Sequence, residues 1–491
     1  MSIDNPERQN RIDKMIRLKE AGISVYPAKF EKLNNLKDVH NLKEGGGIKS
    51  AGRLMTLRDM GKITFGHLQD ISGKTQIVFQ KDKIGEELYK LLLNDIDLGD
   101  ILGVEGAVFV TKKGERSILV KKWTFLGKAI LPLPEKWHGL ADQEVAYRQR
   151  YLDLISNEGV KERFIFRSNL IKALREFYWE EGFMEVETPT LTHKATGAAA
   201  RPYYTRNNAE DIDLVLRISH ELPLKELIVG GFEKIFELGK VFRNEGKDPS
   251  HLPEHTHLEH YCAYWDFEDN IRFTEKMYDH LFKVLNLEKK RSILDKNGRE
   301  VEVDFSTPWN RLDYIAAVNQ DSGLDILSYN DADKLRKDLK KQKIEFDGME
   351  KMGLSALIDN IYKKVTRPKI INPTIIYNYP KIVQPLARIN DDDERIVDQF
   401  QLVINGWEML KAYSELVDPL DQRARFEEQA AAKKAGDEEA FEVDDEYLTA
   451  MEHGMPPISG WGMGIDRLAA ILSKQNNLRD VILFPLVKKK E

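Results

Sequence analysis

The sequence predicts an α+β protein, in which a small N-terminal β-barrel precedes a larger antiparallel sheet flanked by helices. Short β-rich runs fill residues 48–133 and are separated by glycine-containing turns. After residue 160, longer strands and helices mix without a regular β–α–β alternation, which favours an antiparallel sheet with helices around it. The length of 491 residues predicts about two to four domains.

The N-terminal segment, residues 1–47, is expected to be helical, because apolar side chains recur at helical spacing over residues 5–21 and Gly22 is a suitable stop. The β-rich region that follows has five candidate strands and one helical interruption, KIGEELYKLLL. This pattern is typical of a barrel of the OB type, which binds single-stranded nucleic acid on one face. A small β domain without a ligand fits the pattern equally well.

Residues 134–160 are interpreted as a linker, which begins within the proline-containing run LPLPEKWHGL. Residues 161–491 form the larger predicted domain. Its expected elements are a long amphipathic helix ending near Gly182, a strand pair joined by the loop GKDPSHLPEH, and a hairpin around Asn405. The lysine-rich residues 328–366 are predicted to be a helical insertion, and residues 420–450 to be charged helices on a solvated face.

The composition argues against a protein covered in basic charge, because 74 Lys and Arg residues face 81 Asp and Glu residues. A specific RNA partner remains possible, since binding depends on local patches. Cys262 is the only cysteine, so the chain forms no internal disulfide and no cysteine-rich zinc site. The polar N-terminus and the lack of long apolar runs predict a cytoplasmic protein with no membrane span.

Two strands are predicted to bring charged side chains over one pocket. Arg243 and Glu245 are two apart, as are Glu259 and Tyr261 on the returning strand, and residues two apart on a strand share a face. An antiparallel pair could therefore place all four side chains together. The simpler alternative is a salt-bridge ladder on a solvated face, which the pattern alone favours.

Arg467 is expected in the first turn of a helix that follows glycines at 460, 462 and 464. A helix N-terminus with a guanidinium group suits a polyphosphate, although close packing against a strand explains the glycines as well. Glu408 and Glu415 flank a strand-like run and could hold magnesium or a cationic substrate, or be exposed strand residues. Glu221 could equally be a residue that favours a helix start.

Taken together, the sequence segments around these residues resemble those of the class II lysyl-tRNA synthetases. The resemblance covers nearly the whole chain and rests on segments that occur in order, namely RYLDLIS, GFMEVETPTL, GAAARPY, ELPLKELIVGGFEKIFELGKVFRNEG, PPISGWGMGIDRL and RDVILFP. It implies an N-terminal OB-type anticodon-binding domain and a catalytic antiparallel sheet. It also implies a homodimer, with the first class II segment, ending at Pro189, at its interface.

The resemblance implies substrates, a cofactor and site residues. The substrates are ATP, L-lysine and tRNA(Lys), with Mg²⁺ as cofactor. Arg243 and Arg467 would be catalytic. ATP would be bound by Arg243, Glu245, His251, His255, Glu408 and Arg467, and Mg²⁺ by Glu408. Lysine would be bound by Gly197, Glu221, Glu245, Tyr261 and Glu415, because two carboxylates and a phenol suit an ammonium group. The anticodon would be contacted by Arg58, Phe65, Gln76 and Glu115.

Three positions depart from the family pattern. Gln401 stands where a second metal-binding glutamate is usual, which puts the number of metal ions in doubt. His255 replaces the phenylalanine that stacks on adenine, and Lys411 replaces an asparagine near the substrate. Two other functions remain open: a related ligase for a different amino acid, and a non-catalytic tRNA-binding paralogue. Glu221 and Glu415 argue against the aspartyl and asparaginyl enzymes, because they would repel an acidic substrate.

Overall fold

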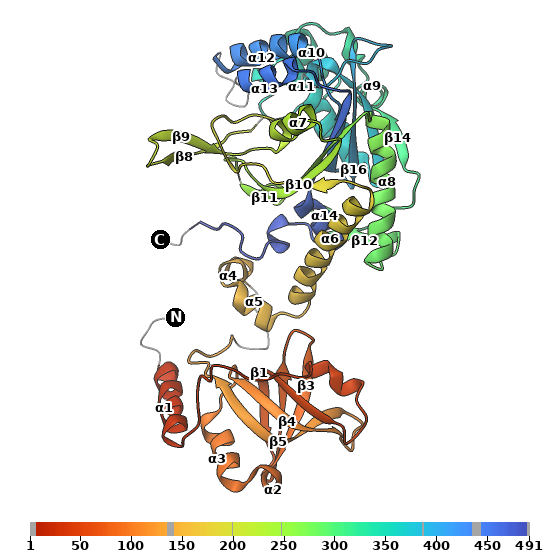
Figure 1. Ribbon diagram of the computed structural model, residues 1–491. Helices are drawn as coiled ribbons and strands as arrows, with labels where there is room; N and C mark the ends of the chain where they lie inside the picture. Colours follow the sequence, from red (N-terminus) through yellow and green to blue (C-terminus); the bar gives the residue numbers. More distant parts are fainter. Residues whose placement is uncertain are drawn as a thin grey trace. The chain divides into compact units, whose positions relative to one another are not determined.

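The computed structural model describes residues 6–134, 142–198, 200–246, 248–384, 387–434 and 443–488. The chain divides into two compact units, Met1–Lys161 and Glu162–Glu491, which are described separately (Figure 1). No helix among the described residues is both long enough and apolar enough to cross a bilayer.

The first unit contains a closed five-stranded barrel with the strand order β1-β2-β3-β5-β4. All five predicted strands and the helical interruption are confirmed. The elements are β1 (Gly47–Asp59), β2 (Ile63–Gln69), β3 (Lys74–Gln80), α2 (Lys81–Ile84), α3 (Glu86–Asp95), β4 (Ile101–Val110) and β5 (Arg116–Gly127). Alternate residues such as Leu54, Leu68 and Ile118 point inward and are fully buried.

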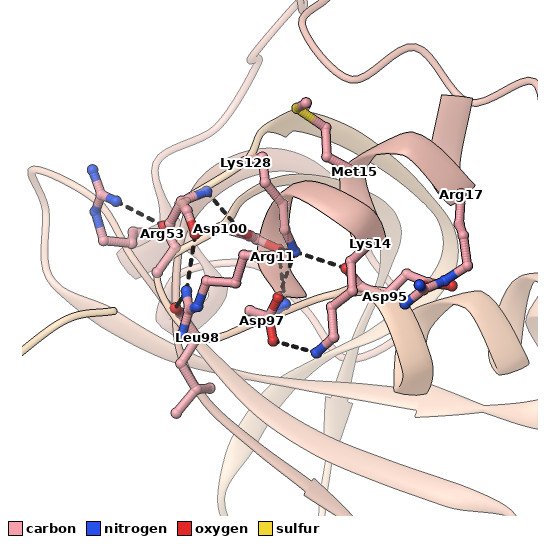
Figure 2. A network of polar contacts seen from close by, with 12 residues as sticks. Arg11, Lys14, Met15, Arg17, Arg53, Asp95, Asp97, Leu98, Asp100 and Lys128 are labelled. Carbon is pink, nitrogen blue, oxygen red and sulfur yellow. Dashed lines mark hydrogen bonds and ion pairs between the residues drawn. The ribbon is translucent and has the colours of Figure 1, made fainter. Parts of the chain in front are cut away.

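The N-terminal helix α1 (Pro6–Glu20) is tied to the barrel by a polar network (Figure 2). The Lys128 ammonium is fully buried and contacts Asp97 and Asp100 at 2.7 and 2.9 Å. Lys14 of α1 reaches Asp97 at 2.6 Å, and the Arg11 guanidinium donates to the backbone oxygens of Leu98 and Ala129. The predicted helix is thus confirmed, and ion pairs as well as apolar contacts hold it.

The segment predicted as a linker contains two short helices, α4 (Gln143–Arg148) and α5 (Arg150–Ser156). Residues 135–141 lie outside the described part of the chain. The α5 helix is pinned by a buried pair between Arg150 and Asp153 at 2.5 Å. The described part of the predicted linker is therefore largely helical.

The second unit is built on an eight-stranded sheet with the order β14-β15-β16-β17-β18-β11-β10-β6. Its neighbours are antiparallel except at the two edges, where β14 pairs with β15 and β6 with β10 in parallel. The strands are β6 (Met184–Glu185), β10 (Lys234–Phe242), β11 (Glu254–Ala263), β14 (Asn310–Asp313), β15 (Thr374–Pro380), β16 (Ile396–Ile404), β17 (Trp407–Ser414) and β18 (Ile458–Gly464). The predicted fold class is therefore confirmed.

One face of this sheet is covered by long helices (Figure 1). These are α6 (Val160–Glu180), α8 (Phe267–Val284) and α14 (Ile465–Leu472). The α8 helix packs on β16, β17 and β18, and α14 packs on β11. Along β11, Leu258 and Cys262 enter this core, while Glu259 and Tyr261 point to the opposite face.

The remaining helices lie around the sheet. They are α7 (Glu221–Val229), α9 (Tyr314–Ser322), α10 (Ala332–Lys341), α11 (Leu354–Ile361), α12 (Pro419–Lys434) and α13 (Asp445–Glu452). Residues 328–366 are largely helical, as predicted, and contribute to a core of their own with Tyr314 and Tyr379. Two small sheets complete the unit: β7 (Leu191–Thr192) with β9 (Ile212–Leu216) and β8 (Tyr203–Asn207), and β12 (Lys290–Leu294) with β13 (Glu300–Asp304).

Candidate active site

A cavity of about 320 Å³ opens on the sheet face opposite the long helices. Its floor is β18, where Gly460 and Gly462 leave the backbone bare between the side chains of β11 and β17. Most of the predicted substrate-binding residues line it, namely Gly197, Glu221, Arg243, Glu245, His251, His255, Tyr261, Glu408 and Arg467. The sheet thus gathers residues that lie up to 270 positions apart, from 197 to 467.

Arginine side chains mark one end of the cavity. Arg467 lies in the first turn of α14, as predicted, and its guanidinium donates to the backbone oxygen of Glu408 at 2.8 Å. A second nitrogen of Arg467 lies 3.3 Å from Nε2 of His251, whose Nδ1 lies 2.7 Å from the Asp248 carboxylate. With Nδ1–H donating to Asp248, Nε2 of His251 accepts from Arg467. This series of hydrogen bonds orients the Arg467 guanidinium.

The electrostatics of this end favour an anion. Burial is the main cause of the lowered pKa of Arg243 and Arg467, and the two guanidinium groups also repel each other. Burial, reinforced by Arg243, lowers the pKa of His255 to about 2, so its imidazole is neutral. Guanidinium groups remain charged near neutral pH, so Arg243 and Arg467 give this end of the cavity a positive charge that favours a negatively charged ligand.

The prediction that Arg243 and Glu245 lie on a strand was wrong. The β10 strand ends at Phe242, so both residues lie in the loop beyond it. Both still line the cavity, and the Arg243 backbone N–H continues the register of β10 and β11 by donating to the Pro253 oxygen at 2.8 Å. Glu259 and Tyr261 do share a face of β11, as predicted.

Glu259 is a fixed carboxylate at the centre of the cavity floor. Its Oε1 accepts from Ser219 Oγ at 2.9 Å and from the His220 backbone N–H at 3.1 Å, and His257 Nδ1 lies 3.0 Å away. Burial opposes the charge, but the hydrogen bonds hold the pKa of Glu259 well below its usual value. Sequence reasoning did not assign this residue a role.

His220, His257 and Glu259 form the one cluster of metal-ligating residue types found in the described part of the chain. Their contacts explain the cluster without a metal, because Glu259 Oε1 already has three close donors. A carboxylate oxygen in that state has little capacity left for a cation. We therefore read the cluster as a support for Glu259.

The opposite end of the cavity is acidic. Glu221 is the first residue of α7, and Glu415 follows β17. Sequence reasoning missed that Lys225, one helical turn after Glu221, bridges them: its Nζ lies 2.6 Å from Glu221 Oε1 and 2.5 Å from Glu415 Oε2. The i,i+4 spacing in ELPLK was the available signal. Burial lowers the pKa of Lys225, but the two carboxylates more than offset this and raise it well above its usual value.

One oxygen of Glu415 is left over. Among the described residues Glu415 Oε1 has no hydrogen-bond partner, although the side chain is almost completely buried. It reaches the cavity floor beside Tyr261 at Gly460, where an added Cβ would lie only 2.1 Å from Oε1 and 2.5 Å from the Tyr261 ring. Since a buried carboxylate oxygen without a donor is unfavourable, this oxygen marks a place for a cationic ligand.

Two further residues shape the acidic end. The Tyr413 hydroxyl donates to Glu221 Oε2 at 3.0 Å, and burial keeps the pKa of this phenol raised so that it remains a donor. Gly197 has φ +82°, a conformation that favours glycine, and its position for a Cβ lies 3.0 Å from Glu221. Both residues thus crowd Glu221 into one orientation.

The predicted metal ligands are not equally placed. Glu408 lines the cavity, with its Oε2 3.7 Å from the Arg367 guanidinium. Gln401 is buried on β16 and does not line the cavity; its Oε1 is an acceptor for the Tyr362 hydroxyl at 3.4 Å. The residues therefore fit a cation held by Glu408, but they do not fit one held by Gln401.

The four predicted anticodon residues gather on one outer face of the barrel. Arg58 and Phe65 are direct partners across β1 and β2, and Gln76 Nε2 donates to Glu115 Oε2 at 2.8 Å. Phe65 is partly exposed, while Arg58 and Glu115 are exposed. An aromatic ring beside polar groups suits a single-stranded nucleic acid, and the individual roles stay predictions.

Comparison with known proteins agrees with this geometry. The profile of the family described as "tRNA synthetases class II (D, K and N)" matches residues 142–488. The chain belongs to the class II tRNA synthetases. In this synthetase a second profile, "OB-fold nucleic acid binding domain", matches residues 48–126, which contain the barrel.

Several relatives of this class II synthetase match over most or nearly all of their length. A lysine–tRNA ligase of Lactococcus lactis is 44% identical, with 99% of each chain covered, and one of Carboxydothermus hydrogenoformans is 42% identical, with 98% of each covered. A lysine–tRNA ligase of Aquifex aeolicus is 46% identical over 90% of this synthetase and 73% of the relative.

Proposed function

We propose that this class II tRNA synthetase joins L-lysine to tRNA(Lys) at the expense of ATP. The observation that carries the proposal is the cavity lined by Glu221 and Tyr261 at one end and by Arg243 and Arg467 at the other. The unpartnered Glu415 oxygen lies at the acidic end, next to Gly460 of the floor. An acidic end and a guanidinium end, joined by one floor, match a substrate pair made of an ammonium-bearing amino acid and a triphosphate.

The reaction has two steps. An oxygen of the lysine carboxylate attacks the α-phosphorus of ATP, and the bond to the β-phosphate breaks so that pyrophosphate leaves with the electron pair. A ribose hydroxyl of the terminal tRNA adenosine then attacks the lysyl carbonyl, and AMP leaves. Arg243 and Arg467 stabilise the phosphate charge, and His251 orients Arg467. Catalysis arises from positioning and fixed charge, because neither step needs a protein nucleophile.

Lysine selection follows from charge at the acidic end. Glu221 and Glu259 face one internal ammonium, that of Lys225, so the wall stays negative after its own ion pairs are formed. Burial raises the pKa of Glu415 to about 8, and a ligand cation beside it would favour its charged form. A ligand ammonium, with three N–H donors, would neutralise the remaining negative charge of the wall, whereas an aspartate side chain would be repelled. Glu245 and Gly197 would bind the α-amino end.

Magnesium is proposed as the cofactor, with Glu408 as its one protein ligand. Bound Mg²⁺ would neutralise part of the triphosphate charge. His255 would face the adenine, where a neutral imidazole can stack. The outer face of the barrel would bind the anticodon, two chains would pair as a homodimer through the region of α6, and the cytoplasmic location remains a prediction.

The test is amino-acid-dependent ATP–pyrophosphate exchange, followed by charging of tRNA(Lys). Lysine should be the preferred amino acid, and Glu221→Gln should raise the KM for lysine far more than the KM for ATP, because it removes a charge from the acidic end alone. Exchange that prefers another amino acid would favour the related-ligase alternative. Binding of tRNA without any exchange would favour the non-catalytic alternative, and either result would refute the proposal.

A further inference from the structure

Lys411 is a cavity residue that the proposed reaction has not used. It lies on the cavity face of β17, between Gln401 of β16 and Gly462 of β18. Its Nζ donates to Gln384 Oε1 at 2.5 Å and lies 5.6 Å from the centre of the Tyr413 ring. Among the described residues it forms no ion pair within 4 Å, so a partly buried ammonium has only a neutral acceptor and a ring.

The position of Lys411 lies between the two ends of the cavity. Glu408, at the guanidinium end, and Glu221, at the acidic end, are the two carboxylates that act most on its charge. Burial nevertheless lowers the pKa of Lys411, so these carboxylates do not fully compensate the ammonium. An anionic ligand between the two ends would supply the missing charge. The lysine carboxylate meets the α-phosphate of ATP in this region.

The surroundings of Lys411 are poor for a second divalent cation. Mg²⁺ needs several oxygen ligands in octahedral geometry, and carboxylates are the usual protein donors. Glu408 already faces Arg367 at 3.7 Å, and Gln401, the Cα partner of Lys411, turns its oxygen to Tyr362. The Lys411 ammonium would itself repel a metal ion placed beside it.

We propose that Lys411 is a catalytic residue that takes the place of a second magnesium ion, neutralising the reacting carboxylate and α-phosphate during adenylate formation. The inference rests on the proposed function and specifies the charge of its active site. The ammonium donates hydrogen bonds to the anionic oxygens and keeps its proton throughout. The carboxylate oxygen still forms the new bond to phosphorus, and pyrophosphate still takes the electron pair of the broken bond.

The kinetic experiment is a Mg²⁺ titration of lysine-dependent ATP–pyrophosphate exchange at fixed ATP. The wild-type rate should depend on Mg²⁺ to first order and saturate once ATP carries one ion. Lys411→Gln should lower kcat about 100-fold, the size of loss typical for removing one charge-stabilising group, with little change in the KM for lysine. Lys411→Arg should recover much of the rate, because it restores the charge.

Two further variants separate charge at this position from charge nearby. Lys369→Gln is the matched control, because Lys369 pairs with Asp321 at 2.6 Å and does not line the cavity. It should leave kcat unchanged. The double variant Gln401→Glu/Lys411→Asn supplies a carboxylate and removes the ammonium, so its rate should return only at excess Mg²⁺ and rise with second-order dependence.

A direct count of bound ions tests the inference without turnover. Electron paramagnetic resonance of Mn²⁺, with a non-hydrolysable ATP analogue, should give one ion per wild-type site and an additional ion in the double variant. Two ions in the wild type, a second-order Mg²⁺ dependence, or an unchanged kcat in Lys411→Gln would each overturn the role of Lys411. A lack of lysine-dependent exchange would instead refute the proposed function, and the Mn²⁺ count would then still decide whether the site holds one ion or two.

Discussion

Gly460 shows how much of the candidate site depends on the absence of one methyl group. Its Cα lies between Tyr261 and Tyr413 on the neighbouring strands, and the free space above it is where Glu415 Oε1 reaches the cavity. Glu415 is otherwise enclosed behind the sheet, paired with Lys225. The residue proposed to bind the ligand, Glu415, and the residue that leaves room for it, Gly460, are therefore different.

Replacing Gly460 with alanine should damage lysine binding selectively. The added Cβ would lie 2.1 Å from Glu415 Oε1 and 2.5 Å from Tyr261, so one of these groups must move. We expect the KM for lysine to rise by more than about tenfold, which corresponds to roughly 1.4 kcal/mol of lost binding, while the KM for ATP is retained. Exchange kinetics measure both. Gly464→Ala, where the nearest atom lies 3.9 Å away, should keep the KM for lysine.

His255 makes the stability of the second unit sensitive to acid. Its folded pKa of about 2 lies below the usual value of 6.5, so below pH 6.5 the unfolded chain binds a proton that the folded chain does not. The stabilisation is complete above pH 6.5 and is lost progressively as the pH falls towards 2. His260, with a pKa lowered by burial to about 3, acts in the same direction.

His255→Phe should therefore weaken this acid sensitivity. We expect the difference in thermal unfolding midpoint between pH 7.5 and pH 5 to become smaller than in the wild type, although His260 preserves part of it. Differential scanning calorimetry at the two pH values measures this difference. His453→Gln, at an exposed position, is the control, and an equal effect there would contradict the assignment.

At the scale of elements, the docking of α1 on the barrel depends on charges in an apolar setting. Lys128 is enclosed, and its ammonium also donates to the Asp95 backbone oxygen at 2.7 Å. Burial raises the pKa of Asp100 in spite of Lys128, whereas Lys128 and Lys14 lower the pKa of Asp97 against the effect of burial. Removing the common cation leaves Asp100 as a buried, poorly compensated carboxylate (Figure 2).

Lys128→Met should lower the free energy of unfolding of the first unit by about 3–5 kcal/mol, the usual loss when one partner of a buried ion pair is removed. Hydrogen exchange resolved by mass spectrometry should show faster exchange in α1 and β4 of the full chain, with the second unit unchanged. Lys113→Met, in the exposed turn between β4 and β5, should leave exchange as it is.

At the scale of the whole molecule, α6 carries an exposed apolar strip in the region where the proposed dimer would form. Trp179 is 55% exposed and Ile165 is 40% exposed, and Met184 just beyond the helix is 47% exposed. A shallow groove runs along the same helix beside Ile171. A largely exposed tryptophan that lines a groove on its own helix favours a protein–protein interface there.

Trp179→Glu should convert the proposed dimer into a monomer, because it places a charge at the centre of that strip. Sedimentation velocity measures the change in mass. Tyr204→Glu, at a 75% exposed position on β8, should leave the mass unchanged. A wild-type chain that sediments as a monomer at micromolar concentration would contradict the dimer.

Much of this architecture was accessible from patterns in the sequence. The five barrel strands, the β10–β11 pair, the hairpin at Asn405 and the start of α14 before Arg467 follow from local alternation and turn residues, and all are confirmed. Positions of single residues at element ends were less predictable. Arg243 was expected on a strand and lies one residue beyond it: its N–H still bonds to Pro253, the next partner in register, but proline has no N–H to return the bond, so the ladder ends there.

By itself, the sequence determined the fold class, the elements and the set of residue types available for chemistry, since periodicity and turn composition are local properties of a chain. Only the tertiary structure decided which of those residues meet. It turned Gln401 to Tyr362 and away from the cavity, placed Lys225 between Glu221 and Glu415, and gave Lys411 no carboxylate partner within the described part of the chain. These outcomes depend on contacts between strands and helices far apart in the chain. Differences of a few ångströms in packing there decide which charged groups pair, and local sequence patterns do not record them.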